Sequence, residues 1–247
     1  MKSDYTLEII AFCIEACQIA ITSGADRIEL CDNPGEGGTT PSAGLIRKAV
    51  SISPIHVFPI IRPRGGDFLY SKAEFEIMLE DVACCRDAGC QGVVLGLLLA
   101  DGRVDVDRTK RLVEKAEPME VTFHRAFDRV ANASQSLEEV IHCGCRRVLT
   151  SGGMPNASEG IPQIAALQTQ AMGRITIMPG AGIRSSNIEQ IVRQTGATEL
   201  HSSASIPMPS RMSYTAPAIK ENLSHLVPSA KEVRAMRSAL DIMSLGR

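Results

Sequence analysis

The segment VTFHRAFD, residues 121–128, places a histidine, an arginine and an aspartate at the end of a strand-like run. Alternation along a strand puts His124 on the face opposite Phe123. Imidazole, guanidinium and carboxylate groups are the side chains that transfer protons and stabilise developing charge in enzymes. The segment therefore predicts catalytic roles for His124, Arg125 and Asp128.

Polar residues also interrupt or follow three other strand-like runs. Glu8 lies in LEIIAF, Glu29 lies in RIELC, and Arg62 follows IHVFPII. Alternation puts Glu29 on the face opposite Ile28 and Leu30, which suit packing under helices. A lone buried charge can be half of a structural ion pair. Two carboxylates, a guanidinium and an imidazole in one place instead favour a catalytic site with shifted pKa values, so Glu8, Glu29 and Arg62 are also predicted to be catalytic.

Three later strand-like runs end in glycine and small hydroxyl residues, in TSGG (150–153), PGAGI (179–183) and HSSAS (201–205). Bare backbone amides and small hydroxyls suit the binding of an anion such as phosphate, although the same residue types also make tight turns. The predicted anion-binding residues are Ser151, Gly152, Gly153, Gly180, Gly182, Ser202 and Ser203.

These residues need a scaffold that brings the ends of several strands together, and an internal repeat indicates one. Four stretches share a pattern: SGADRIEL at 23, AGCQGVVL at 88, CGCRRVLT at 143 and TGATELHS at 195. In each, a glycine of the kind that closes a helix is followed at once by a strand-like run. Further strand-like runs lie at 7–12, 55–61, 120–127 and 174–179.

Helix starts fall between the strand-like runs, and Ser71–Glu74 and Ser136–Glu139 have the spacing of capping boxes. Eight strands that alternate with eight helices predict an α/β fold, a single-domain (β/α)8 TIM barrel over 1–247, with eight parallel strands inside and the helices outside. An open doubly wound sheet is the alternative, but no GxGxxG follows the first strand-like run. Residues 206–228 lack a clear pattern and are expected to form a long loop between the eighth strand and the eighth helix.

Composition narrows the range of partners. The 247 residues include 26 basic and 28 acidic side chains, a net charge of −2 that offers no basic field to nucleic acid. No run approaches the roughly 18 apolar residues of a membrane span. The first residues do not resemble a secretory signal, so the eight cysteines favour reduced thiols and a cytoplasmic location. No nucleic-acid or membrane partner is expected, and a homodimer is compatible with the sequence.

Seven motifs resemble, in this order, those of the CutC copper-homeostasis family: GADRIELC, EGGTTPS, IIRPRGGDF, VTFHRAFD, RVLTSGG, GAGI and ELHSSA. The similarity runs from residue 7 to about residue 205. It implies a (β/α)8 barrel and a cytoplasmic protein that binds or handles copper. The chain departs from the family in its first strand, where Ile10 stands at a position that is commonly cysteine and Cys13 at one that is often serine.

The sequence is therefore compatible with two functions, copper handling and acid–base catalysis. Cu(I) prefers thiolate and thioether ligands, and the predicted ligands are Cys31 and Cys13, although cysteine is also a common core residue. The glutamate, arginine, histidine and aspartate side chains instead favour an enzyme of isomerase or lyase type that uses acid–base chemistry on a small phosphorylated or carboxylated metabolite. The expected partner is a small anionic molecule or a copper ion.

A barrel gives the predicted site a definite place, because the carboxyl ends of the strands form the mouth where barrel enzymes act. We expect His124 to face the lumen in a cluster with Glu29 and Arg62. A histidine between a carboxylate and a guanidinium should keep a charge that is adjustable near neutral pH. Asp128 is expected at the rim of the mouth.

Overall fold

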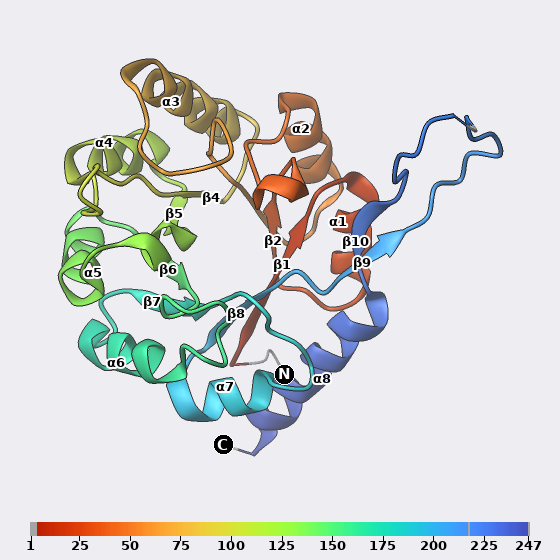
Figure 1. The fold of residues 1–247 in the computed structure, drawn as a ribbon. Helices are drawn as coiled ribbons and strands as arrows, with labels where there is room; N and C mark the ends of the chain where they lie inside the picture. The colour runs from red at the N-terminus through yellow and green to blue at the C-terminus, as the bar shows by residue number, and fades with distance from the viewer. Residues whose placement is uncertain (1–3, 217, 247) are drawn as a thin grey trace.

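The structure is a computed structural model that describes residues 4–216 and 218–246, and its ribbon is a ring of strands surrounded by helices (Figure 1). No helix among the described residues is long and apolar enough to cross a membrane. Strands and helices alternate in the order β1 (Thr6–Ala11), α1 (Ile14–Thr22), β2 (Arg27–Leu30), α2 (Ala43–Ile52), β3 (His56–Pro59), α3 (Lys72–Asp87), β4 (Gly92–Leu95), α4 (Val106–Ala116), β5 (Glu120–Phe123), α5 (Ala133–His142), β6 (Arg147–Thr150), α6 (Ile161–Ala171), β7 (Thr176–Pro179), α7 (Ile188–Thr195), β8 (Glu199–Ser202), β9 (Ser205–Met208), β10 (His225–Pro228) and α8 (Ala230–Leu245).

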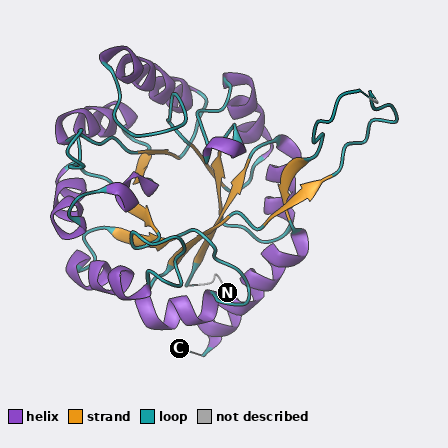
Figure 2. Cartoon of the chain, in the orientation of Figure 1, coloured by secondary structure: helices purple, strands orange, loops and turns teal. Residues whose placement is uncertain are grey.

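The first eight strands pair in parallel and form two arcs of a ring. One arc has the order β3-β2-β1-β8 and the other β4-β5-β6-β7. A parallel bridge between Ile60 and Val94 joins the first arc to the second, and β7 lies against β8 on the other side. The helices lie outside this ring (Figure 2). The predicted α/β barrel with parallel strands inside and helices outside is confirmed.

Alternation along each strand divides the side chains between the lumen and the surrounding helices. Leu7 and Ile9 of β1 and Phe123 of β5 belong to the main apolar core that includes residues of the helices. The neighbouring positions of the same strands, Glu8 and His124, take the opposite face. A smaller apolar cluster in the lumen consists of Cys31, Phe58, Ile60 and Val94. The strand register therefore sends the polar side chains of interest into the lumen.

Helix starts follow local capping chemistry. Ser71 and Glu74 form the predicted capping box at the start of α3, each side chain accepting a hydrogen bond from the backbone of the other. The predicted box at Ser136 is wrong, because α5 begins at Ala133, four residues before the start that a cap at Ser136 would give. Asn132 caps this helix with its side chain, and Ser136 lies buried inside it. Asparagine is as good a helix N-cap as serine, so the sequence is compatible with a start of α5 after Asn132 or after Ser136.

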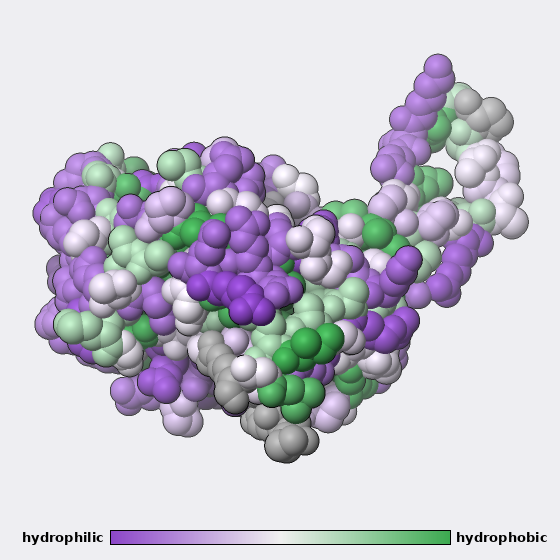
Figure 3. Space-filling view, turned by 90° about the horizontal axis from the view of Figure 1, so that it is seen from below, coloured by the Kyte–Doolittle hydropathy of each residue, from purple (hydrophilic) through white to green (hydrophobic). Residues whose placement is uncertain are grey.

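Residues 206–228, which were expected to form an irregular loop, include a hairpin. Strand β9 pairs antiparallel with β10, so that Ile206 stands opposite Val227. The described residues between these strands, 209–216 and 218–224, extend away from the barrel as an arm (Figures 1 and 3). Arg211 of the arm donates to Glu15 of α1 at 2.7 Å. Sequence analysis does not predict the hairpin, because its two strands are only four residues long and lie far apart in the chain.

Candidate functional site

A cavity of about 1090 Å³ lies at the carboxyl ends of the strands. Glu29 of β2, Arg62 after β3, His124 after β5 and His201 of β8 all line it. Of these four, Glu29, Arg62 and His124 were predicted, and the other predicted residues that line the cavity are Arg125, Gly182 and Ser203. The predicted residues that do not line it are Glu8, Asp128, Ser151, Gly152, Gly153, Gly180, Ser202, Cys13 and Cys31. This is the face where barrel enzymes place their active sites, so the cavity is the candidate site.

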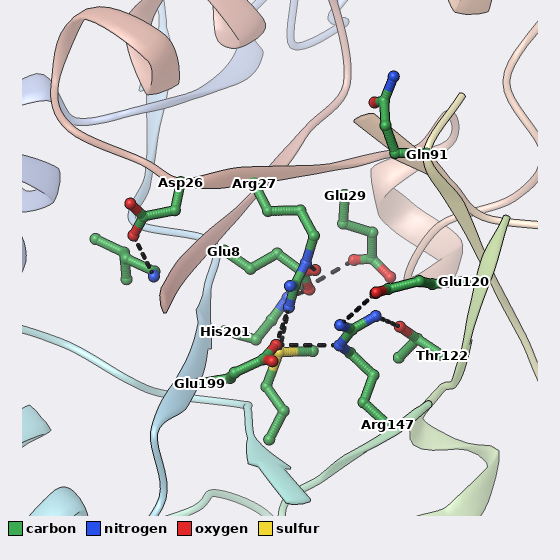
Figure 4. A network of polar contacts seen from close by, with 12 residues as sticks. Glu8, Asp26, Arg27, Glu29, Gln91, Glu120, Thr122, Arg147, Glu199 and His201 are labelled. Carbon is green, nitrogen blue, oxygen red and sulfur yellow. Dashed lines mark hydrogen bonds and ion pairs between the residues drawn. The ribbon is translucent and has the colours of Figure 1, made fainter. Parts of the chain in front are cut away.

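His201 stands between two carboxylates in the lumen (Figure 4). Its Nδ1 lies 2.7 Å from Glu8 Oε1, and its Nε2 lies 3.7 Å from Glu29 Oε2. Burial raises the pKa of Glu29 to about 7, and the charge of Glu8 adds to this while His201 opposes it. Burial lowers the pKa of His201, but the two carboxylates outweigh burial and the pKa is raised. Glu29 can therefore gain or lose a proton near neutral pH, as a general base or acid must.

Glu8 lies below the cavity in a buried ion pair. Arg27 donates from Nε to Glu8 and from Nη2 to Glu199 Oε2, the second bond at 2.5 Å. Burial opposes ionisation of Glu8, but Arg27 and His201 outweigh it and lower the pKa of Glu8 to about 2. The structure thus shows Glu8 as half of an ion pair, the alternative that the sequence left open. Through its bond to His201 it acts as a positioning residue.

A second arginine extends the ion network across the lumen (Figure 4). Arg147 donates to Glu199 at 3.0 Å and to Glu120 at 2.6 Å. The ring of Phe58 has Arg27 and Arg147 over it, with their Cζ atoms 5.1 and 5.2 Å from its centroid. Each buried charge in this layer has a partner, as buried ions require. The network therefore fills the barrel beneath the site.

His124 is held in one orientation at the cavity wall. Its Nδ1 accepts the backbone N–H of Ala126 at 3.1 Å, so the neutral ring carries its proton on Nε2. A Cβ at position 96 would lie 2.5 Å from Nδ1, so Gly96 makes room for the ring. Burial lowers the pKa of His124 to about 3, and Arg62 lowers it further. The expectation of an adjustable charge is therefore wrong, because Glu29 pairs with His201 and the charge of Asp128, which raises the pKa of His124, does not offset burial and Arg62.

The guanidinium of Arg62 donates hydrogen bonds to the loops that follow β2 and β3. Its Nη1 donates to the carbonyls of Glu36 at 2.5 Å and Gly38 at 2.7 Å, and its Nη2 donates to the carbonyl of Gly66 at 2.8 Å. The ring of Phe68 packs on it, with Cζ 5.1 Å from the ring centroid. Arg62 is thus fixed in place and contributes its charge, rather than its two terminal nitrogens, to the cavity.

Asp128 itself occupies the position predicted for an external anion. Its Oδ1 accepts from the hydroxyl of Thr150 at 2.5 Å and from the backbone N–H groups of Ser151 at 2.9 Å and Gly153 at 3.1 Å. Its Oδ2 accepts from Arg125 at 2.7 Å. The side chain of Asp128 is only 5% exposed, so it lies behind the rim and not on it. The hydroxyl of Thr150 and the N–H groups of Ser151 and Gly153 are therefore engaged by a carboxylate of the chain, and the N–H of Gly152 donates to Thr150 Oγ1.

The remaining predicted anion-binding residues differ in their surroundings. The hydroxyl of Ser202 donates to the carbonyl of Ile183 at 2.7 Å. Gly180 packs closely in the lumen, because a Cβ there would lie 2.4 Å from the side chain of Leu149. The predicted residues that face the cavity are Gly182 and Ser203. An anion in the cavity would thus meet these two residues.

The two predicted copper ligands have different partners. The thiol of Cys31 bonds to Glu29, and burial, with the charge of Glu29, holds the pKa of Cys31 well above its usual value. Cys13 caps α1, where its sulfur accepts the N–H of Ala16 at 3.4 Å, and its neighbouring thiol is Cys17. In the described part of the chain, no three histidine, cysteine, aspartate or glutamate side chains are arranged to hold a metal ion.

His201 is the main site residue that sequence analysis missed. In the run ELHS it shares a strand face with Glu199, opposite Leu200, which is the same alternation that identified Glu29. That signal could have found His201. Gly96 gives no such signal, because its role depends on how close the ring of His124 approaches from the next strand.

Related proteins have the same sequence pattern over most of the chain. The family model described as the CutC family matches residues 5–206. A CutC family protein of Chromobacterium violaceum is 49% identical over 244 residues, which cover 96% of this chain and 99% of the relative. A CutC family protein of Vibrio cholerae serotype O1 is 50% identical over 210 residues, which cover 84% of this chain and 83% of the relative.

Solved structures share the barrel. A Streptococcus agalactiae CutC, provisionally assigned to copper homeostasis, superposes with a TM-score of 0.77 at 32% identity, over 81% of this chain and 98% of that one. An N-(5'-phosphoribosyl)anthranilate isomerase of Pyrococcus furiosus shares the fold alone, with a TM-score of 0.57 at 13% identity, over 96% of this chain and 98% of that one. The barrel, its polar lumen and the sequence matches over most of its length together show that the chain belongs to the CutC family.

Proposed function

We propose that the chain is an enzyme that moves a proton to or from a small anionic metabolite in the mouth cavity, with Glu29 as the general base or acid. The observation that carries this proposal is a buried carboxyl at the cavity wall whose pKa is raised to about 7. A catalytic base works best when its pKa lies near the working pH. A purely structural carboxylate would be ionised by an adjacent cation, as Glu8 is by Arg27.

The arginine side chains of the cavity are the groups that favour a negatively charged substrate. Arg62, Arg125 and Arg129 line its wall together with the carboxyl side chains of Glu29, Glu36 and Asp67, and Ser203 and Gly182 offer small polar surfaces beside them. A volume of about 1090 Å³ accommodates a phosphorylated or carboxylated metabolite. Isomerase and lyase reactions fit this site, because they begin with removal of a proton by a positioned base.

Binding and turnover measured on the same variants test the proposal. Thermal-shift screening against phosphorylated and carboxylated metabolites would identify ligands, and NMR would follow their conversion. We expect Glu29→Gln to bind the same ligands but to lose at least ~100-fold in turnover, the usual contribution of a general base. Glu114→Gln, on the exposed surface of α4, is the matched control and should retain both. Unchanged turnover in Glu29→Gln would exclude this role for Glu29.

Direct copper handling is the other candidate function, which the description of the Streptococcus agalactiae relative suggests. A Cu(I) site needs deprotonated thiols or thioethers that can converge on one ion. Cys31 fits poorly, because burial and Glu29 keep its thiol protonated. Cys13 also fits poorly, because its sulfur caps a helix. The donor chemistry of the described residues therefore does not support a step that passes through copper.

A further inference from the structure

Two hydrogen-bond donors at the cavity wall are buried without an acceptor among the described residues: Nε of Arg62, whose two terminal nitrogens are bonded, and Nε2 of His124. Nε2 of His124 is inaccessible to solvent, and no described protein group bonds to it. Because Nδ1 already accepts the N–H of Ala126, Nε2 carries the proton and is a donor. Buried donors are almost always paired in native proteins, so an unpaired one needs a specific explanation.

The ring cannot easily turn to satisfy this donor elsewhere. The Ala126 N–H holds one edge of the ring, and the backbone of Gly96 lies close beside it. The ring of Phe68 packs over it, with the two centroids 4.9 Å apart. Phe68 belongs to the segment 61–71, which contains no helix or strand. The ring is thus held in place, and one of the groups that bury it, Phe68, lies on an irregular segment, so a substrate oxygen would reach Nε2 once this side chain moves aside.

Resting on the proposed role of Glu29, we propose that the Nε2–H of His124 binds the carbonyl oxygen of the substrate. The substrate class is therefore a small anionic aldehyde or ketone with a C–H bond next to the carbonyl carbon. Glu29 and His124 belong to β2 and to the end of β5, so they face the same cavity from well-separated strands of the ring. A base on one wall and a donor on another can hold a substrate between them.

The reaction step balances with these two groups alone. The C–H bond next to the carbonyl breaks, and its proton passes to the carboxylate of Glu29. Its electron pair forms a carbon–carbon double bond, while the carbonyl π pair moves to oxygen as an enolate. The Nε2–H of His124 stabilises this oxygen, as a fixed neutral donor does in an oxyanion site. The step reverses when Glu29 returns its proton to carbon.

A neutral histidine suits this task better than a charged one would. Burial and the charge of Arg62 outweigh the opposing charge of Asp128, so His124 keeps the neutral form in which Nε2 is a donor. A donor that does not ionise strengthens its hydrogen bond as charge develops on the substrate oxygen, and it does not exchange its own proton with the intermediate. His124 would therefore be a catalytic residue without being an acid or a base.

Deuterium exchange in D₂O distinguishes a donor from a proton carrier. Dihydroxyacetone phosphate and pyruvate are the carbonyl probes, and glycerol 3-phosphate and lactate are their reduced counterparts. We expect wild-type protein to exchange the C–H protons beside the carbonyl in at least one probe and in neither reduced counterpart. His124→Leu should lose ~100- to 1000-fold of this rate. His124→Gln, which keeps an N–H donor, should retain it within about tenfold.

Several results would overturn the inference, and they differ from those that would exclude the proposed function. Exchange of neither probe by wild-type protein, equal losses in His124→Gln and His124→Leu, or equal activity on reduced counterparts would each remove the carbonyl role. A Glu29→Gln variant that still turns over its ligands would exclude the proposed function instead. Long-range ¹⁵N–¹H NMR of His124 gives an independent readout, because the bound probe should shift the Nε2 proton downfield, and an unshifted proton would contradict the contact.

Discussion

Substitution of Glu29 by glutamine should change how stability depends on pH. The pKa of Glu29 is raised from 4.5 to about 7 in the folded chain, so folding favours the protonated form. The stability that the folded chain gains by holding Glu29 protonated is fully present below pH 4.5 and is lost as the pH rises through 7. At about 1.36 kcal/mol per pKa unit, ionised Glu29 makes the folded state less stable by about 3 kcal/mol at high pH. The glutamine of Glu29→Gln does not ionise, so the stability of this variant lacks the contribution that changes with pH at position 29.

Urea unfolding of both proteins at pH 5 and pH 8 measures this effect. Glu29 makes the folded state less stable by about 1 kcal/mol at pH 5, where this carboxyl is already partly ionised in the unfolded chain, and by about 3 kcal/mol at pH 8. The free energy of unfolding of Glu29→Gln should therefore gain about 2 kcal/mol relative to wild type from pH 5 to pH 8. Glu114→Gln should gain nothing, because this residue is exposed. If Glu29→Gln and wild type keep a constant difference from pH 5 to pH 8, the pKa of Glu29 is not raised and the reasoning fails.

Four further predictions follow from the same contacts. Glu8→Gln should lower the free energy of unfolding by about 3–5 kcal/mol in urea, because Arg27 loses its buried partner; a loss below that of Glu114→Gln would contradict the ion pair. Asp128→Ala should cost about 1–3 kcal/mol, because the N–H groups that it accepts from lose their acceptor. Millimolar phosphate should restore part of the thermal stability of this variant but none in wild type. Cys31→Ser should leave Cu(I) affinity unchanged in competition with a chelator, and a marked loss would support direct copper binding. The His124 ring should stay neutral in an NMR titration from pH 8 to pH 5, since its pKa is about 3; a midpoint near 6.5 would refute its burial.

The barrel was predictable because its signals are local and repeated. Gly24 and Gly144 have positive φ values, as expected for glycines that close a helix before a strand. The faces of the strands were also predictable, since Glu29 and His124 lie opposite residues of the main core. The start of α5 was not, because Asn132 and Ser136 are both good caps and only packing decides between them.

The contacts within the site could be predicted less well, because they depend on distances between strands. The sequence predicts that Glu29, Arg62 and His124 face one lumen, but it does not show that Glu29 pairs with His201. It also could not show that Asp128 fills the loop formed by Ser151 and Gly153. A glycine-rich loop with free amides looks the same in sequence whether its anion comes from the solvent or from the chain.

The opposite pKa shifts of Glu8 and Glu29 have a common origin. Both carboxyl groups are buried in one lumen and both lie near His201. Arg27 bonds directly to Glu8, whereas it has the smallest influence among the causes that act on Glu29. Because two close negative charges repel, the carboxyl that holds the guanidinium ionises and the other retains its proton to higher pH. Arg27 therefore determines which carboxyl can exchange a proton at neutral pH, so the ion network beneath the cavity sets the chemistry available at its mouth.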